Sequence, residues 1–217
     1  MDDIDLNHLP YEPIPPKKWN PFYRFIAFVL ALGLLLLSWQ GYFYLIHPEP
    51  LSVVQLADIQ SFLPDHPITP FTSHAPERIK VVLSETESEL KQIANVIATR
   101  SCKKADNLCY SKALFYFVRD QIRYVPDPRF DDRLENPITT LKTGGADCED
   151  MAVLLAGLQK AIGNDAKLVF IPGHVYAQVR IPSHRDKWFN MEATCGTCSF
   201  GELPTDLMLE RKQFYNL

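Results

Sequence analysis

The sequence predicts an α+β domain that follows a single membrane-spanning helix. Three patterns support this: an uncharged apolar run over residues 25–46, helical spacing in the middle of the chain, and strand-like alternation in the last third. The chain has 217 residues, of which 47% are hydrophobic, enough for one ordinary domain with added segments. Its net charge of −4 gives no sign of a nucleic-acid partner.

The apolar run reads FIAFVLALGLLLLSWQGYFYLI and holds 22 residues without a charged side chain. As a helix it would be about 33 Å long, enough to cross the hydrocarbon layer of a bilayer. Aromatic residues flank both ends, as at a membrane interface. A signal peptide or a buried helix is the alternative, but a signal peptide has a shorter apolar core and a small-residue cleavage site. The pattern therefore favours a transmembrane helix over residues 22–46.

The basic residues predict the direction of this helix. Lys17, Lys18 and Arg24 precede the apolar run, whereas the next lysine or arginine after it is Arg78. The positive-inside rule then places the N-terminus in the cytoplasm and the rest of a single-pass protein outside the cell membrane. The tail over residues 1–21 is polar and proline-rich, and we expect it to be disordered.

The chain beyond the apolar run divides into two predicted parts. Residues 47–76 contain six prolines, which is typical of a semi-rigid stalk. The outer domain is predicted to occupy residues 77–217. Apolar spacing predicts helices over residues 77–100 and 111–124. Residues 125–137 hold three prolines and several acids, so this stretch must be irregular.

A single cysteine stands at the start of another helical pattern, in the run GGADCEDMAVLLAGL over residues 144–158. Asp147 can cap this helix, because its carboxylate can accept hydrogen bonds from the free N–H groups of the first turn. Glu149 and Asp150 lie in that first turn, where the helix dipole favours negative charge. The same position favours a reactive thiolate. Cys148 is therefore a candidate nucleophile, the alternative being a small hydrophobic residue at a helix start.

Two alternating stretches follow, HVYAQVRI over residues 174–181 and KWFNME over residues 187–192. The short loop between them predicts an antiparallel hairpin. If the hairpin is centred on Ser183, His174 lies directly opposite Glu192, with Cβ atoms about 5 Å apart. The other opposed pairs in this register are Arg180 with Asp186 and Gln178 with Trp188.

These residues have the chemistry of a catalytic triad. Cys148 would supply the thiolate, His174 would accept and return a proton, and Glu192 would orient the imidazole and stabilise its charged form. Taken singly, His174 and Glu192 would be ordinary surface residues. Their complementary positions in one hairpin, after a helix-capped cysteine, favour the catalytic interpretation.

The blocks GGADCEDMAVLLAGL, GHVYAQV and WFNMEATC resemble the three motif blocks of transglutaminase-like, papain-type thiol enzymes. The resemblance covers roughly residues 77–203, and the DCED block is also similar to that of bacterial transglutaminase-like cysteine proteinases of the periplasm. It implies a papain-like core, in which the helix bearing the cysteine packs on an antiparallel sheet. One departure stands out: the family usually has aspartate, in a block like Asp-Pro-Thr, where this chain has Glu192, Ala193 and Thr194. Because glutamate is one methylene longer, the backbone must stand back or the register must shift.

The resemblance implies a membrane-anchored enzyme that acts on amide bonds of proteins or peptides through an acyl-enzyme on Cys148. We expect hydrolysis rather than crosslinking, because the sequence shows no dedicated amine site. Tyr124 and Gln178 are candidate oxyanion donors beside the Cys148 N–H group. The expected partners are a protein or peptide substrate and membrane lipid around residues 22–46. Two alternatives are a non-catalytic binding or assembly protein that keeps the fold, and a zinc-stabilised module without thiol chemistry.

Four further cysteines form two close pairs, Cys102 with Cys109 and Cys195 with Cys198. Outside the membrane they are expected to form disulfides, with structural zinc or free thiols as alternatives. The predicted chemistry needs no cofactor. A calcium ion on Asp147, Glu149 and Asp150, as the resemblance suggests, is a further alternative to their cap and dipole roles.

Overall fold

The computed structural model describes residues 20–46, 48–64, 76–128, 133–184 and 187–217. The chain forms two compact units, Met1–Ile46 and His47–Leu217. Most of the predicted tail, residues 1–19, lies outside the described residues, as do residues 65–75 of the predicted stalk.

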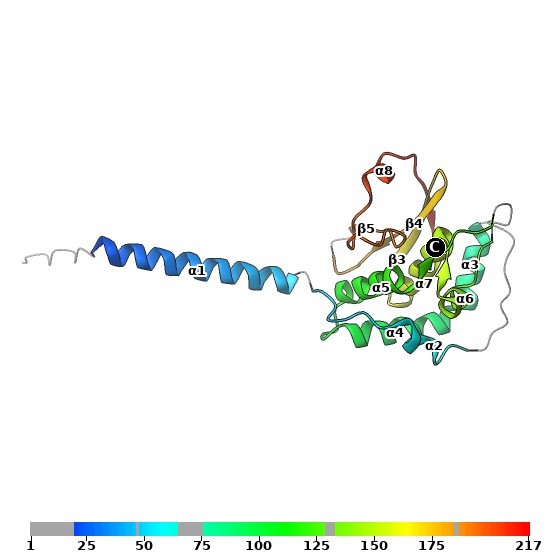
Figure 1. Ribbon diagram of the computed structural model, residues 1–217, viewed down its shortest axis with the longest axis horizontal. Helices are drawn as coiled ribbons and strands as arrows, with labels where there is room; N and C mark the ends of the chain where they lie inside the picture. Colours follow the sequence, from blue (N-terminus) through cyan, green and yellow to red (C-terminus); the bar gives the residue numbers. More distant parts are fainter. Residues whose placement is uncertain (1–19, 47, 65–75, 129–132, 185–186) are drawn as a thin grey trace, which may run out of the picture. The chain divides into compact units, whose positions relative to one another are not determined.

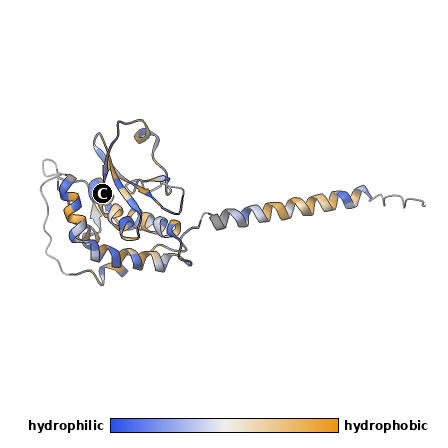
Figure 2. Cartoon of the chain, turned by 180° about the vertical axis from the view of Figure 1, so that it is seen from behind, coloured by the Kyte–Doolittle hydropathy of each residue, from blue (hydrophilic) through white to orange (hydrophobic). Residues whose placement is uncertain are grey.

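The first unit contains helix α1 (Pro21–Ile46). Its segment Pro21–Tyr42 is long and apolar enough to cross a membrane, with a mean hydropathy of 2.0. Figure 2 shows the hydrophobic colouring along the middle of this helix. A signal sequence near an N-terminus can meet the same criteria of length and hydropathy. The helical structure predicted for residues 22–46 is confirmed.

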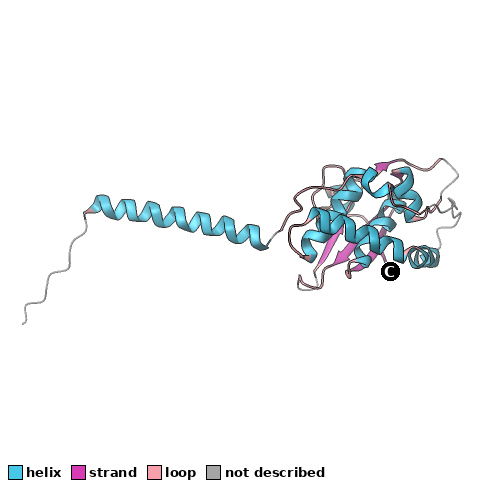
Figure 3. Cartoon of the chain, turned by 90° about the horizontal axis from the view of Figure 1, so that it is seen from below, coloured by secondary structure: helices cyan, strands magenta, loops and turns pink. Residues whose placement is uncertain are grey.

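The second unit combines helices with an antiparallel sheet (Figures 1 and 3), so the predicted α+β class is confirmed. Its helices are α2 (Leu56–Gln60), α3 (Pro76–Glu85), α4 (Glu87–Ser101), α5 (Asn107–Gln121), α6 (Pro137–Thr143), α7 (Cys148–Ala161) and α8 (Thr205–Met208). Its strands are β1 (Arg123–Tyr124), β2 (Gly145–Ala146), β3 (Asp165–Ile171), β4 (His174–Arg180), β5 (Trp188–Met191) and β6 (Gln213–Asn216). The main sheet has the order β5-β4-β3-β6, with antiparallel neighbours, and β1 pairs with β2 in parallel.

Helix α7 is the centre of the core. Every residue from Glu149 to Gln159 is buried, and the helix packs against β3 and β4 on one side and against α4, α5 and α6 on others. Strand β4 contributes Val175, Ala177 and Val179 to this core. The predicted packing of the cysteine-bearing helix on the sheet is therefore present.

The long helix predicted over residues 77–100 is in fact two helices, α3 and α4, separated by Thr86. The Thr86 hydroxyl donates a hydrogen bond to the carbonyl of Val82 at 2.8 Å, and the backbone of Thr86 leaves the helical region (φ −109°, ψ 10°). A threonine that bonds to the preceding turn in this way competes with helix continuation. Apolar spacing alone did not reveal the break, because it continues across Thr86.

The described half of the predicted stalk packs on the domain. In residues 48–64, Val54 and Ile59 are buried in the main core, with exposed fractions of 7% and 0%. The Gln60 side chain donates hydrogen bonds to two backbone carbonyls of α6, at 3.1 and 2.9 Å. The second unit therefore includes this segment and does not start at residue 77, where the sequence placed the domain boundary.

Candidate active site

Cys148 begins α7, as the sequence predicted. The Asp147 carboxylate caps this helix by accepting a hydrogen bond from the N–H group of Asp150 at 3.0 Å. Gly144 ends α6 in the left-handed region (φ 68°), which favours glycine. A Cβ on Gly145 would lie 3.1 Å from a side-chain carbon of Val125, the residue that follows β1. The two glycines thus allow the close turn that leads the chain into Cys148.

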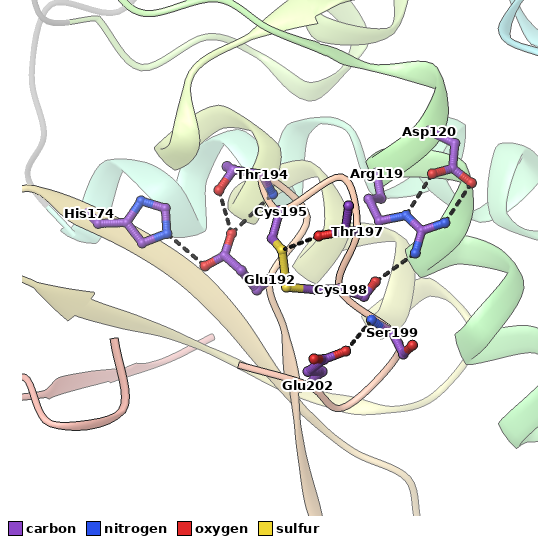
Figure 4. The surroundings of a disulfide bond; sticks show 10 residues. All are labelled: Arg119, Asp120, His174, Glu192, Thr194, Cys195, Thr197, Cys198, Ser199 and Glu202. Carbon is purple, nitrogen blue, oxygen red and sulfur yellow. Dashed lines mark hydrogen bonds and ion pairs between the residues drawn. A yellow bond between two sulfur atoms is a disulfide. The ribbon is translucent and has the colours of Figure 1, made fainter. Parts of the chain in front are cut away.

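His174 and Glu192 lie beside each other near adjacent strand ends. His174 begins β4, and Glu192 follows the last residue of β5. The His174 Nε2 atom lies 2.7 Å from Oε2 of Glu192 (Figure 4). The other carboxylate oxygen, Oε1, accepts hydrogen bonds from the N–H group and the hydroxyl of Thr194, at 3.0 and 2.6 Å. Glu192 is only 1% exposed, so these contacts supply the partners that a buried carboxylate needs.

The hairpin register differs from the predicted one by two residues. Gln178 lies opposite Asn190, and Arg180 lies opposite Trp188, whereas the sequence placed Trp188 opposite Gln178. The predicted partner of Arg180, Asp186, lies outside the described residues. The observed pairs are symmetric about His184, the middle residue of the connection, whereas the prediction was centred one residue earlier, on Ser183.

The contact between His174 and Glu192 is compatible with this shift for a simple reason. A displacement of two residues keeps every side chain on its predicted face of the sheet. The observed pairs end at Ala177 and Met191, and the same register continued beyond them places Tyr176 opposite Glu192, so that His174 is a diagonal neighbour of Glu192 instead of its opposed partner. Diagonal neighbours are separated by about 7–8 Å, and the extra methylene of glutamate helps to span that distance.

The electrostatics couple His174 to both partners. Burial lowers the pKa of His174, but hydrogen bonds with the Cys148 and Glu192 side chains, and the negative charges of both, raise it to about 10. The raised pKa favours the charged, imidazolium form of His174. Because its Nε2 atom faces Glu192, Nδ1 is the ring nitrogen left for the thiol. The structure thus brings the three predicted side chains together as a chain of acid, imidazole and thiol.

Tyr124 also lies near the cysteine. Burial, and then the negative charges of Cys148 and Asp147, raise the pKa of its phenol, and half of the residue is exposed. Tyr124 belongs to β1, which the sequence had assigned to the end of the preceding helix. The other candidate oxyanion donor, Gln178, instead donates a hydrogen bond to Asn190 at 2.7 Å.

The four remaining cysteines form two disulfides, Cys102–Cys109 and Cys195–Cys198. These are the two pairings that the sequence favoured. Cys148 is the free cysteine of the chain and is half-buried.

The acids beside Cys148 have roles in the helix and the core. Asp147 is the cap, and the buried Asp150 accepts a hydrogen bond from the backbone N–H of Glu135 at 2.7 Å. Burial, and then the charge of Asp147, raise the pKa of Asp150 to about 8. Within the ranges that the structure describes, no group of three or more His, Cys, Asp or Glu side chains is placed to hold a metal ion.

Residues 93–193, which include all three candidate residues, match the family model of the transglutaminase-like superfamily. The second unit therefore contains a transglutaminase-like domain, the class of domain that its motifs resemble. No curated protein matches the chain.

Several solved structures are similar at low identity. A candidate protease from Parabacteroides distasonis ATCC 8503 is 13% identical, with a TM-score of 0.44; the match covers 55% of this chain but only 26% of that protein. EGTA-treated LapG from Legionella pneumophila is also 13% identical (TM-score 0.40), with 76% of this chain and 80% of LapG covered. Calcium-bound LapG is 14% identical (TM-score 0.38), with 75% and 88% covered.

Proposed function

We propose that this protein is a membrane-anchored thiol hydrolase that cleaves amide bonds of proteins or peptides through an acyl-enzyme on Cys148. The observation that carries the proposal is the contact series from Glu192 through His174 to the free thiol at the start of α7. Its place in a transglutaminase-like domain supports the same assignment.

In the proposed reaction, the Cys148 thiolate attacks the carbonyl carbon of the amide, and a carbon–sulfur bond forms. The negative charge moves to the carbonyl oxygen, which the Cys148 N–H group can stabilise because the first N–H groups of a helix have no partner within it. The Tyr124 hydroxyl is the proposed second donor. His174 gives its proton to the leaving amine as the carbon–nitrogen bond breaks.

The second half of the reaction regenerates the thiolate. His174, now neutral, takes a proton from water, and the resulting hydroxide attacks the thioester. The carbon–sulfur bond breaks and the acid product leaves, while Glu192 stabilises the imidazolium that has formed again. Water is the proposed acceptor, because the sequence shows no dedicated site for an amine.

The main competing interpretation is a binding protein that keeps the fold without catalysis. Its support in the sequence is Glu192, which stands where the family usually has aspartate. The 2.7 Å contact between Glu192 and His174 weakens the support for a non-catalytic protein, because the longer acid reaches the imidazole from its diagonal position.

We further propose that α1 anchors the protein in the cell membrane, with the N-terminus in the cytoplasm and the domain outside. The basic residues before the apolar run support this direction. The two disulfides of the second unit support it independently, because disulfides persist mainly in oxidising compartments outside the cytoplasm.

The decisive experiment is alkylation of the full-length protein, in detergent, with iodoacetamide at pH 6 and pH 10. Cys148 is the free cysteine, so the label reports on it alone. A free thiol with a pKa of about 8.5 should react roughly 300-fold faster at pH 10 than at pH 6. We expect a difference below about tenfold for this protein, and loss of the pH 6 reaction in His174→Ala. A ratio like that of a free thiol would contradict the proposal.

Substrate cleavage is the second readout. Incubation with a mixture of short peptides, followed by mass spectrometry, should reveal hydrolysed amide bonds with the wild-type protein. Cys148→Ala should give none. Equal product from both proteins would assign the cleavage to a contaminant.

A further inference from the structure

We infer that Thr194 is a positioning residue for Glu192, and that the Cys195–Cys198 disulfide holds Thr194 in place. This inference rests on the proposed function. Thr194 does not contact the thiol in the series above, and its role would be to fix which carboxylate oxygen faces His174.

The two carboxylate oxygens of Glu192 have different hydrogen-bond partners. Both donor groups of Thr194 point at Oε1, the N–H group from 3.0 Å and the hydroxyl from 2.6 Å. Oε2 is left to the imidazole of His174. Two donors on one oxygen resist rotation of the carboxylate about its last bond. Removal of the hydroxyl should therefore reduce the time that Oε2 spends against the imidazole.

The backbone that carries Thr194 has little regular structure of its own. Strand β5 ends at Met191, and the loop after Glu192 includes the exposed residue Gly196. The Cys195–Cys198 disulfide closes this loop directly after Thr194. The covalent bridge thus limits the conformations available to the residue that bonds Glu192.

A second contact ties the bridge to helix α5 (Figure 4). The Arg119 Nη1 atom donates a hydrogen bond to the carbonyl of Cys198 at 2.6 Å. Two further nitrogens of the same guanidinium contact the Asp120 carboxylate at 2.6 and 3.0 Å, and its centre lies 4.6 Å from the ring centroid of Tyr116. Because the guanidinium of Arg119 has hydrogen-bond partners for its N–H groups and an aromatic ring against its plane, its orientation is restricted. Arg119 therefore links α5 to the loop that the disulfide closes.

The test compares the ratio of the Cys148 alkylation rates at pH 6 and pH 10 in matched variants. Thr194→Val keeps the size and the backbone N–H but loses the hydroxyl, and we expect the ratio to fall about tenfold, since one hydrogen bond to a charged group is lost. Thr194→Ser keeps the hydroxyl and should restore the ratio. The rate at pH 10 should be the same in all variants, because every accessible thiol is ionised there.

The two disulfides provide a matched pair of controls. The double variant Cys195→Ser/Cys198→Ser adds no free thiol, and it should lower the ratio in the same direction as Thr194→Val. The double variant Cys102→Ser/Cys109→Ser removes the other bridge, and it should leave the ratio unchanged even if it lowers stability.

The outcomes separate this inference from the proposed function. If wild type keeps a high ratio and Thr194→Val matches it, Thr194 does not position Glu192. If Thr194→Val slows both rates equally, its role is structural and the inference is also wrong. An unchanged ratio without the Cys195–Cys198 bridge would overturn the role of the disulfide. A wild-type ratio like that of a free thiol would instead overturn the proposed function.

Discussion

The Oε2 atom of Glu192 lies 2.7 Å from Nε2 of His174, although the β4–β5 register, continued past its last pair, makes the two residues diagonal neighbours. The contact therefore depends on side-chain length as well as on strand register. Where the family usually has aspartate, this chain combines a longer acid with its own register. Glutamate is thus part of the geometry that brings the carboxylate to the imidazole.

Shortening this acid should be as harmful as neutralising it. Glu192→Asp withdraws the carboxylate by about one carbon–carbon bond, and Glu192→Gln removes its charge. We expect either change to lower the alkylation rate of Cys148 at pH 6 by about tenfold to a hundredfold, because each loses a charged hydrogen bond to His174. Glu202→Asp, at an exposed acid in the same loop, is the matched control. Full reactivity in Glu192→Asp would show that the contact does not require glutamate.

The raised pKa of His174 predicts a pH-dependent contribution to stability. Its folded-state pKa of about 10 exceeds the ordinary value of 6.5, so the folded state binds the proton more tightly. The resulting stabilisation is fully present below about pH 6.5 and is lost as the pH rises towards 10. In urea unfolding, wild type should therefore lose stability relative to His174→Gln over this range, by at most about 1.4 kcal/mol per pH unit. A difference that does not change with pH would argue against a charged His174.

Asp150 should show a linkage of the same sign as His174, over a lower pH range. Burial raises its pKa from 3.8 to about 8, so the unfolded state loses the proton first as the pH rises. Folding stability should fall from about pH 4 to pH 8 because of this group, and then level off. Asp150→Asn removes this effect while retaining an acceptor for the Glu135 N–H group. The variant should therefore gain stability relative to wild type across the same range, by at most about 1.4 kcal/mol per pH unit in urea unfolding. A constant difference from pH 4 to pH 8 would contradict the buried, protonated state.

The packing of residues 48–64 on the domain can be tested with one core substitution. Ile59 is fully buried, so Ile59→Ala should lower the free energy of unfolding by about 2–5 kcal/mol. Leu51→Ala is the control, because Leu51 is 66% exposed and its truncation should change stability by less than about 0.5 kcal/mol. Both are measured by urea unfolding of the domain. Equal, small effects would restore the interpretation of this segment as a separate stalk.

The proposed membrane topology predicts an asymmetric pattern of proteolysis. A protease added to the outside of intact cells or right-side-out vesicles should digest the domain after residue 47 and spare residues 1–21. Antibodies against tags at the two ends of the chain would detect which part survives. Protection of the domain would show that it lies on the cytoplasmic side. Disulfides would then not be expected from the compartment of the domain.

The sequence was most informative where local chemistry and fold agree. The start of α7 follows from an aspartate cap and an apolar helical run, both of which are local signals. The alternation in β4 and β5 correctly predicted strands and their faces. The register was not predictable in the same way, because it depends on the conformation of the loop between the strands.

Tertiary contacts explain the remaining differences. Six prolines made residues 47–76 look like an extended stalk, yet Val54 and Ile59 are held by core residues that are distant in the sequence. Thr194 was likewise not identified as a partner of Glu192. A threonine two residues after an acid is a common local hydrogen-bonding pattern, but it signals positioning only once the acid is known to face His174.

The contacts of α2 make residues 48–64 and residues 76–217 two pieces of one fold. Ile59 fills part of the core, and Gln60 bonds α6. A cut in the chain between α2 and α3 would therefore leave a nicked protein whose fragments stay associated without a covalent link. Such a cut would not shed the domain from α1, and a recombinant fragment that begins at residue 77 would lack one piece of its own interior.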